Sequence, residues 1–204
     1  MTDPVKAWYF ARKGNRLGFG DNRIVRVGIT HTTDRKPVLC EHGFHGSTRV
    51  IDALLYASYH ILYRVVLSGE MDIGGDKIAA QARQYLQRFD MKDILREFAR
   101  KQALINIHKI KPYTPKADYA SIVRWLETGD ESVRSLAWSV GFPAAREAPV
   151  KSAVWASVWA STEAAARSAE SVAWAAGLAV REEAREAQNE MLLEMITDKY
   201  GAIQ

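Results

Sequence analysis

Residues 61–67 (ILYRVVL) constrain the fold of this 204-residue chain more than any other segment. All seven are apolar or aromatic except Arg64, and they include two β-branched valines and an isoleucine, which favours a strand. A continuous apolar run of this length is typical of a strand buried within a sheet. We therefore expect a sheet in the first part of the chain, with this segment inside it.

Two further segments predict strands of the same sheet. Residues 5–11 (VKAWYFA) are rich in β-branched and aromatic types and end at a Lys-Gly-Asn turn. Residues 24–32 alternate in polarity, and the preceding GFGDN suits a hairpin turn. The sequence thus predicts a mostly antiparallel sheet.

One helix is expected within this sheet unit. Residues 50–57 place their apolar side chains on one helical stripe, and Ser47 or Thr48 precedes them as an N-cap. We therefore predict that residues 1–75 form a small α+β head.

The pattern changes to a helical period after Gly74 and Gly75. Asp76 is suited to cap a helix whose apolar positions are Ile78, Ala79, Ala82, Tyr85 and Leu86. The helical pattern repeats over residues 92–107, 117–128 and 131–140. We therefore expect residues 76–204 to form an all-helical body, continuous with the head in one domain or separate from it. The predicted fold class is α+β.

An alanine-rich tract over residues 152–187 belongs to this body. Alanine has the best intrinsic helix propensity, so we expect one long helix or a helical hairpin. Trp155, Trp159 and Trp174 either fill the core between closely packed helices or form a partner-docking face, because exposed tryptophans are typical of interfaces.

The composition excludes some classes of protein. No run of eighteen apolar residues is present, so no segment is expected to span a membrane. The chain has a single cysteine, and its first residues lack the pattern of a secretory signal. We therefore expect a cytoplasmic protein.

Positive charge is concentrated in the middle of the chain. Residues 77–116 contain ten Lys or Arg and three Asp or Glu, whereas residues 151–204 contain five and eight. The basic segment indicates either a nucleic-acid partner or a solvated helix surface facing the acidic tail. The residues expected to contact phosphates are Arg83, Arg88, Arg96, Arg100 and Lys101.

Residues 39–79 hold the candidate chemistry. Cys40, His42 and His45 are soft or borderline metal ligands, but a zinc site needs a fourth group, and only His31 is a plausible one. A thiol–imidazole pair of Cys40 and His42 is conceivable on an extended strand, but no oxyanion hole is evident. We therefore predict neither a metal nor a resident cofactor.

The sequence pattern LCEHGFHGS…DALLYAS…LYRVVLSGEM…GGDKIAA, with AQNEMLLEMI near the end, resembles an uncharacterised domain common in bacteriophage and prophage genomes. The resemblance covers residues 6–89 and 152–197. It implies an accessory or counter-defence role, such as an anti-CRISPR-like protein, in the cytoplasm of a host cell.

Residues 39–71 also resemble the middle of an ADP-ribosyltransferase of the diphtheria-toxin-like class. The resemblance rests on Gly43-Phe-His45, on a helix with Tyr56 over residues 53–57, and on a V-x-L-x-G strand over residues 65–69. It implies that Tyr56 stacks on nicotinamide and that His45 lies near the NAD site. The His-Gly-Thr of the first strand is missing, and the helical pattern after Gly75 predicts no strand for the catalytic Glu.

These observations favour a phage-type protein that acts by binding a macromolecule, most plausibly a host or defence protein, over an enzyme. A second copy of the chain is another expected partner. The alternatives are an NAD-binding relative of the transferases, with His42, His45 and Tyr56 as the candidate pocket, and a nucleic-acid-binding protein.

Overall fold

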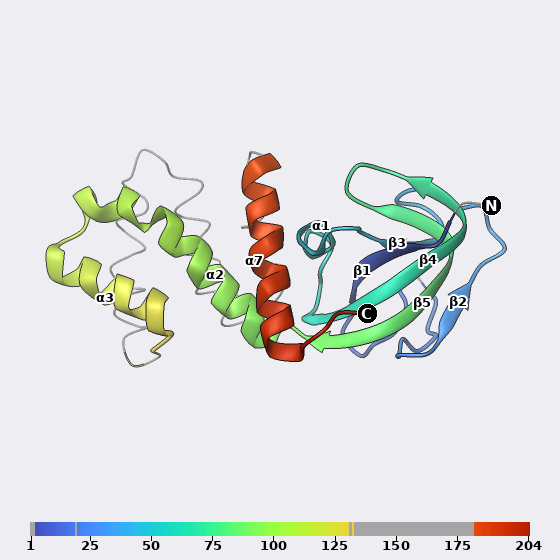
Figure 1. Ribbon diagram of the computed structural model, residues 1–204, viewed down its shortest axis with the longest axis horizontal. Coiled ribbons are helices and arrows are strands. Elements are labelled where there is room, and N and C mark those ends of the chain that lie inside the picture. The colour runs from blue at the N-terminus through green and yellow to red at the C-terminus, as the bar shows by residue number, and fades with distance from the viewer. Residues whose placement is uncertain (1–2, 19, 131, 133–181) are drawn as a thin grey trace.

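The computed structural model describes residues 3–18, 20–130, 132 and 182–204, and it combines an antiparallel sheet with helices (Figure 1). The strands are β1 (Val5–Ala11), β2 (Thr30–Thr32), β3 (Phe44–Gly46), β4 (Ile61–Ile73) and β5 (Ile78–Asp90). The helices are α1 (Val50–Leu54), α2 (Lys92–Asn106), the 3-10 helix η1 (Ile107–Tyr113), α3 (Lys116–Thr128) and α7 (Glu182–Tyr200). The expected α+β class is confirmed, and the described elements that follow Asp90 are helical.

The hairpin of β4 and β5 is the centre of the sheet. Its register runs from the Ile73–Ile78 pair beside the turn to the Ile61–Asp90 pair at the far end, with two bulges between. The expectation of a helix after Asp76 was therefore wrong. The apolar positions of this segment fit both a helical and a strand period, and pairing with β4 along thirteen residues decides for the strand.

All strand pairs of the sheet are antiparallel, in the order β1-β4-β5-β2, and β3 also pairs with β5. β1 has the bounds expected from the sequence. The strand expected over residues 24–32 is limited to its last three residues. Gly28 has a φ of 87° and turns the chain so that its N–H donates to the Tyr85 carbonyl, which ends any longer strand.

Helix α1 is short and lacks the cap that the sequence suggested. Arg49 is the N-cap residue, and no side chain caps the helix. Ser47 instead lies in an isolated β-bridge with Trp8, where the two backbones exchange hydrogen bonds of 2.7 and 3.0 Å. Ser47 thus continues β3, and the expectation of Ser47 or Thr48 as the N-cap was wrong.

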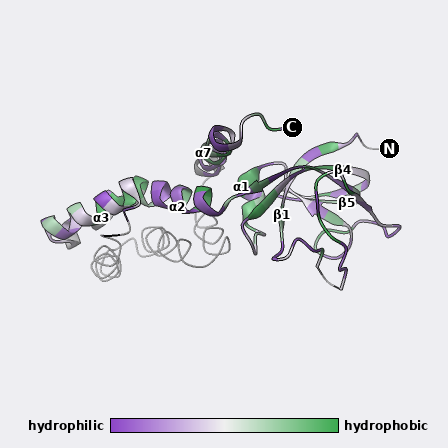
Figure 2. Cartoon of the chain, turned by 90° about the horizontal axis from the view of Figure 1, so that it is seen from below, coloured by the Kyte–Doolittle hydropathy of each residue, from purple (hydrophilic) through white to green (hydrophobic). Residues whose placement is uncertain are grey.

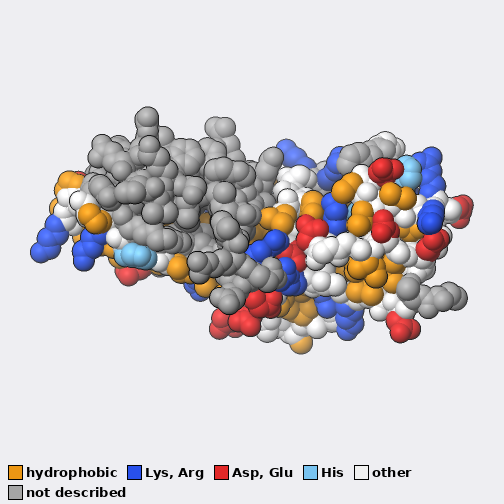
Figure 3. All heavy atoms as spheres, turned by 90° about the horizontal axis from the view of Figure 1, so that it is seen from above, with side chains coloured by type: hydrophobic (Ala, Val, Ile, Leu, Met, Phe, Trp, Pro, Cys, Tyr) orange, Lys and Arg blue, Asp and Glu red, His pale blue; other side chains and the backbone are white. Residues whose placement is uncertain are grey.

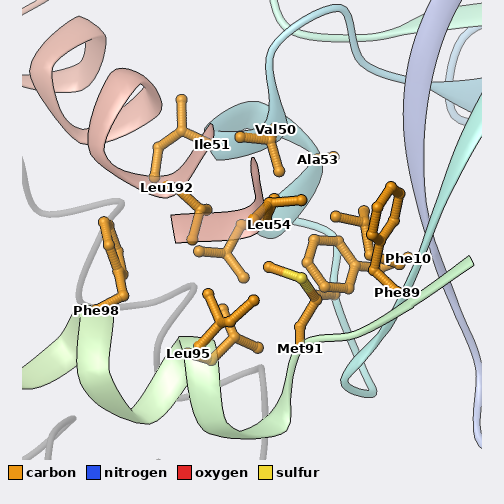
Figure 4. Close-up of a cluster of buried hydrophobic side chains, with 14 of the residues drawn as sticks. Phe10, Val50, Ile51, Ala53, Leu54, Phe89, Met91, Leu95, Phe98 and Leu192 are labelled. Carbon is orange, nitrogen blue, oxygen red and sulfur yellow. The ribbon is translucent and has the colours of Figure 1, made fainter. Parts of the chain in front are cut away.

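One hydrophobic core lies between the sheet and the helices α1, α2 and α7. Figure 4 shows Phe10 and Phe89 of the sheet beside Leu54 of α1, Leu95 of α2 and Leu192 of α7. α7 is far from the other elements in sequence, so its apolar side chains join this core through long-range tertiary packing. Figure 1 shows α7 between α1 and α2.

A second core lies on the opposite face of the sheet. Tyr63 and Val65 of β4 and Tyr85 of β5 are fully buried there. Loop residues Leu17 and Val25 cover them. β1 supplies both cores because alternate side chains of a strand point to opposite faces.

The arm formed by α2 and α3 extends away from the sheet (Figures 1 and 2). Its helices were expected from the sequence, and a third buried cluster around Trp125 and Ile122 packs them together. Gly129 ends α3 in the left-handed conformation, with a φ of 69°, and donates to the Trp125 carbonyl. No helix in the described part of the chain is long and apolar enough to cross a membrane.

Some expectations lie outside the described residues. They are the helix over residues 131–140, most of the tract over residues 152–187, and the docking tryptophans Trp155, Trp159 and Trp174. The boundary expected at residue 75 falls in the turn of the β4–β5 hairpin.

Candidate functional site

The turn of the β4–β5 hairpin brings two charged residues against a tyrosine that follows α1. Gly74 N–H donates to the Lys77 carbonyl across the turn, at 2.9 Å. The Tyr56 hydroxyl donates to Asp76 Oδ2 at 2.5 Å, and the Lys77 ammonium lies 4.3 Å from the centroid of the Tyr56 ring. Tyr56 remains 49% exposed, so its aromatic ring is accessible to a ligand.

Cys40 and His45 also lie near Lys77. Cys40 is exposed and has a φ of 67°, and its side chain raises the pKa of the neighbouring Lys77 ammonium. Its backbone N–H donates to His45 Nε2 at 3.2 Å, which makes that nitrogen an acceptor. His45 is therefore a neutral imidazole in this arrangement.

The protonation states follow from the surroundings of each group. Burial lowers the pKa of His45, and the positive charges of Lys77 and Arg83 lower it further. Burial and the hydrogen bond to Asp76 raise the pKa of Tyr56, and the hydrogen bond to Cys40 raises the pKa of Lys77. At neutral pH Lys77 is thus an ammonium, Tyr56 a phenol and His45 a neutral imidazole.

A buried arginine, Arg83, hydrogen-bonds to the backbone of His45. The guanidinium of Arg83, 2% exposed, donates to the His45 carbonyl at 2.6 Å and lies 3.5 Å from the Tyr9 ring centroid. Its Nε and Nη2 both donate to the Tyr85 hydroxyl, at 3.0 and 2.8 Å. That hydroxyl therefore gives its own hydrogen to His31 Nδ1, 3.0 Å away. The network holds β5, β3 and β2 together below the site.

The structure brings together two of the three residues of the expected pocket. His45 and Tyr56 belong to one cluster, connected through Cys40 and Lys77. His42 is exposed, and its backbone forms a bridge with Val38. We define the site as the hairpin-turn cluster, which contains Cys40, His45, Tyr56, Asp76 and Lys77.

The expected phosphate-contacting residues do not form one helical surface. Arg83 is buried in β5, so it cannot contact a nucleic acid, and Arg88 is exposed on the same strand. Both lie on a strand because pairing with β4 overrides the helical pattern.

The other three are on α2. There Arg96 pairs with Asp93 at 3.9 Å and Lys101 with Glu97 at 3.1 Å. Arg100 is half-buried and lies against the position of Gly129. Part of the positive charge of α2 is therefore compensated on the helix itself.

The described residues contain no group of three or more His, Cys, Asp or Glu side chains that could hold a metal ion. His31, the expected extra ligand for Cys40 and His45, instead contacts Tyr85 in the buried network.

Asp76 and Lys77 were missed as site residues because Asp76 was interpreted as a helix cap. One signal could have identified the turn. A Gly-Gly-Asp-Lys segment between two isoleucines is also a hairpin pattern, whereas the contact of Asp76 with Tyr56 becomes visible only in the folded chain.

Figure 3 views this end of the molecule from above, at the right of the picture. Basic, acidic, histidine and hydrophobic side chains lie interspersed there.

Comparison with known proteins gives one match. Residues 21–97, less than half of the chain, match the family model "Domain of unknown function (DUF7666)". The matched segment includes β2 to β5 and every residue of the hairpin-turn cluster. No curated protein and no solved structure matches the chain.

Proposed function

We propose that the chain binds NAD at the hairpin-turn cluster, as a relative of the diphtheria-toxin-like ADP-ribosyltransferases. The observation that carries the proposal is the hydrogen bond between Tyr56 and Asp76 at the start of β5. The sequence resemblance includes Tyr56, which would stack on nicotinamide, but the helical pattern after Gly75 predicted no later strand, and so no place for the catalytic Glu. β5 is such a strand, and Asp76 lies just before it.

The order of the other elements supports the proposal. β3 contains Phe44 and His45, Tyr56 follows α1, and β4 contains the Val65–Gly69 motif of the resemblance. β5 pairs with both β3 and β4, so the acid before it lies beside the tyrosine.

The side chains of the cluster match the parts of NAD. The exposed ring of Tyr56 offers a stacking surface to the nicotinamide, and the Asp76 carboxylate accepts hydrogen bonds from ribose hydroxyls and stabilises nearby positive charge. Lys77 is placed to neutralise a phosphate. The proposal is for binding, because β1 has Trp8, Tyr9 and Phe10 where the transferases have the ribose-gripping His-Gly-Thr.

Titration calorimetry of the full chain with NAD tests this proposal. Tyr56→Ala is expected to weaken NAD binding by about 5- to 150-fold, since stacking of one base on an aromatic ring contributes about 1–3 kcal/mol. Tyr56→Phe keeps the ring and should retain most of the affinity, whereas Asp76→Asn should lose part of it.

Asp34→Asn, on a loop outside the cluster, is the matched control for Asp76→Asn and should bind NAD as the wild type does. The proposal fails if the wild type does not bind millimolar NAD, or if Tyr56→Ala binds as tightly as the wild type. Nicotinamide release, followed by chromatography, separates binding from cleavage.

The expectation of a phage-type accessory protein that binds a host or defence protein stays a prediction. Its proposed contacts, the tryptophans of residues 152–187, lie outside the described residues. Affinity capture with the full chain and with Trp155→Ala would test it.

A further inference from the structure

A tight turn over residues 38–42 precedes β3 and packs against the turn of the β4–β5 hairpin. Two backbone hydrogen bonds of 2.9 Å join its first and last residues. A Cβ placed on Gly74 would meet the Leu39 side chain at 2.9 Å, so the two turns are in contact. We call residues 38–42 the Cys40 turn. Its position affects the hairpin turn, which carries part of the hairpin-turn cluster.

Two successive backbone N–H groups of the Cys40 turn are held by side chains of the sheet. Leu39 N–H donates to Asp72 Oδ2 of β4 at 2.8 Å, and Cys40 N–H donates to His45 Nε2 of β3 at 3.2 Å. Cys40 has a φ of 67°, a conformation that a residue other than glycine keeps only where its surroundings hold it. His45 Nε2 accepts this bond only while the imidazole is neutral, because protonation turns the nitrogen into a donor.

The surroundings of His45 keep its imidazole neutral. Burial lowers the pKa of His45 most, and the positive charges of Lys77 and Arg83 lower it further. The Gly43 backbone and the Asp72 carboxylate raise the pKa of His45, but by less. Two cations thus face the imidazole against one carboxylate, and that carboxylate also accepts a hydrogen bond from the Cys40 turn.

Arg83 is the buried one of these two cations. Its polar partners among the described residues are the Tyr85 hydroxyl and the His45 carbonyl, and both are uncharged. The Tyr9 ring lies over the guanidinium, with 3.5 Å between the Arg83 carbon Cζ and the ring centroid. No carboxylate in the described part of the chain pairs with Arg83, so its charge acts uncompensated on the neighbouring imidazole.

We propose that Arg83 is a positioning residue of the hairpin-turn cluster, which keeps His45 neutral and so holds the Cys40 turn against the hairpin turn. Arg83 acts through His45 and does not touch a ligand. The consequence for ligand binding rests on the NAD proposal. The coupling of Arg83, His45 and the Cys40 turn can be measured without a ligand.

The proposal sets the direction of the pH dependence. Because the surroundings lower the pKa of His45, the imidazole takes up a proton only as pH falls below the usual 6.5. The proton then occupies Nε2, so Cys40 N–H loses its acceptor and the Cys40 turn keeps only the bond to Asp72. Acid is therefore expected to loosen the contact between the two turns and to weaken NAD binding at the cluster.

A pH titration of the full chain by NMR, without ligand, tests the coupling. The His45 imidazole should titrate below 6.5, and the Cys40 amide signal should shift in the same pH range. Arg83→Met removes the buried charge and should raise the His45 midpoint toward 6.5, whereas Arg83→Lys keeps the charge and should hold the midpoint near the wild-type value. NMR signals of individual imidazoles separate His45 from His31, which contacts the same network through Tyr85.

His45→Gln is the second variant, and it keeps the test decisive if Arg83→Met fails to fold. A glutamine amide oxygen stays an acceptor at every pH, so the acid shift of the Cys40 amide should disappear. The matched control is His42→Gln, which replaces the exposed histidine of the same turn and should leave that shift unchanged. The inference is overturned if the His45 midpoint is equal in wild type and Arg83→Met, or if the Cys40 amide shifts with acid in His45→Gln as in the wild type.

Titration calorimetry with NAD at a series of pH values tests the consequence for binding. Wild-type affinity should fall with pH through the His45 midpoint, and the fall should begin at higher pH in Arg83→Met and flatten in His45→Gln. The same pH profile in His45→Gln and wild type would overturn the role in binding. If the wild type binds no NAD at any pH, the NAD proposal fails, and the NMR result still decides whether Arg83 positions the turn.

Discussion

The ion pairs of Asp52 join the head to the C-terminal helix, and their removal is the most direct test of the fold. The Asp52 side chain is 1% exposed on α1. Its carboxylate pairs with Arg49 at 2.7 Å and with Arg185 of α7. Asn189 of α7 strengthens the same contact by accepting a hydrogen bond from the Ile51 N–H at 3.3 Å.

Asp52→Asn keeps the size of the side chain and removes its charge. Removing one partner of a buried ion pair costs about 3–5 kcal/mol, because the remaining charge is left buried without compensation. Arg49 and Arg185 each retain 24% exposure and can regain water, so we expect the lower end, about 3 kcal/mol. For a chain of this size that loss lowers the melting temperature by about 6–12 °C.

Urea unfolding followed by circular dichroism measures the free-energy change. Asp93→Asn is the matched control, because Asp93 is 73% exposed and its ion pairs with Arg96 and Lys199 are long, at 3.9 and 3.5 Å. It should change stability by less than about 1 kcal/mol. Equal destabilisation by the two variants would refute the argument, and a double-mutant cycle of Asp52→Asn with Arg185→Gln measures the pairing itself.

Three further predictions concern the sheet and its cores. Burial lowers the pKa of His31 below its usual 6.5, so its contribution to stability should be complete above pH 6.5 and should decline as pH falls below that value. In urea titrations His31→Gln should therefore make the free energy of unfolding depend less on pH, and an unchanged pH dependence would contradict the burial of a neutral His31. Gly43→Ala should destabilise by more than Gly20→Ala, because both have positive φ but a Cβ at Gly43 meets the Ala80 carbonyl oxygen at 3.0 Å, and equal melting temperatures would count against this contact. Leu192→Ala removes a fully buried side chain and should cost about 2–5 kcal/mol in thermal unfolding, whereas a cost below about 1 kcal/mol would mean that α7 does not close the first core.

Elements with a clear local pattern were predictable from the sequence. The apolar run of residues 61–67 lies in β4, β1 has its expected bounds, and α2 and α3 follow their helical periods closely. The long hairpin was not predictable in this way. Its second strand has apolar residues that fit both periods, and pairing with β4 decides between them.

The candidate site was predictable only in part, for the same reason. The sequence singled out His45 and Tyr56, but Asp76 becomes a site residue only when the hairpin turn places it beside Tyr56. Arg83 was expected on a basic surface, yet the strand turns it into the second core, where Tyr9 and Tyr85 surround it. A charged residue cannot be assigned to surface or core without knowing which face of its element is covered.

The sequence by itself determined the α+β class, the position of the central strand and the helices of the arm, because these depend on propensity and period within a few residues. The tertiary structure decided the conformation of residues 78–90, the contact of Asp52 with Arg185, and the burial of Arg83. Each of these depends on strand pairing or burial between segments far apart in the chain, and no local pattern encodes which distant segment will be the partner.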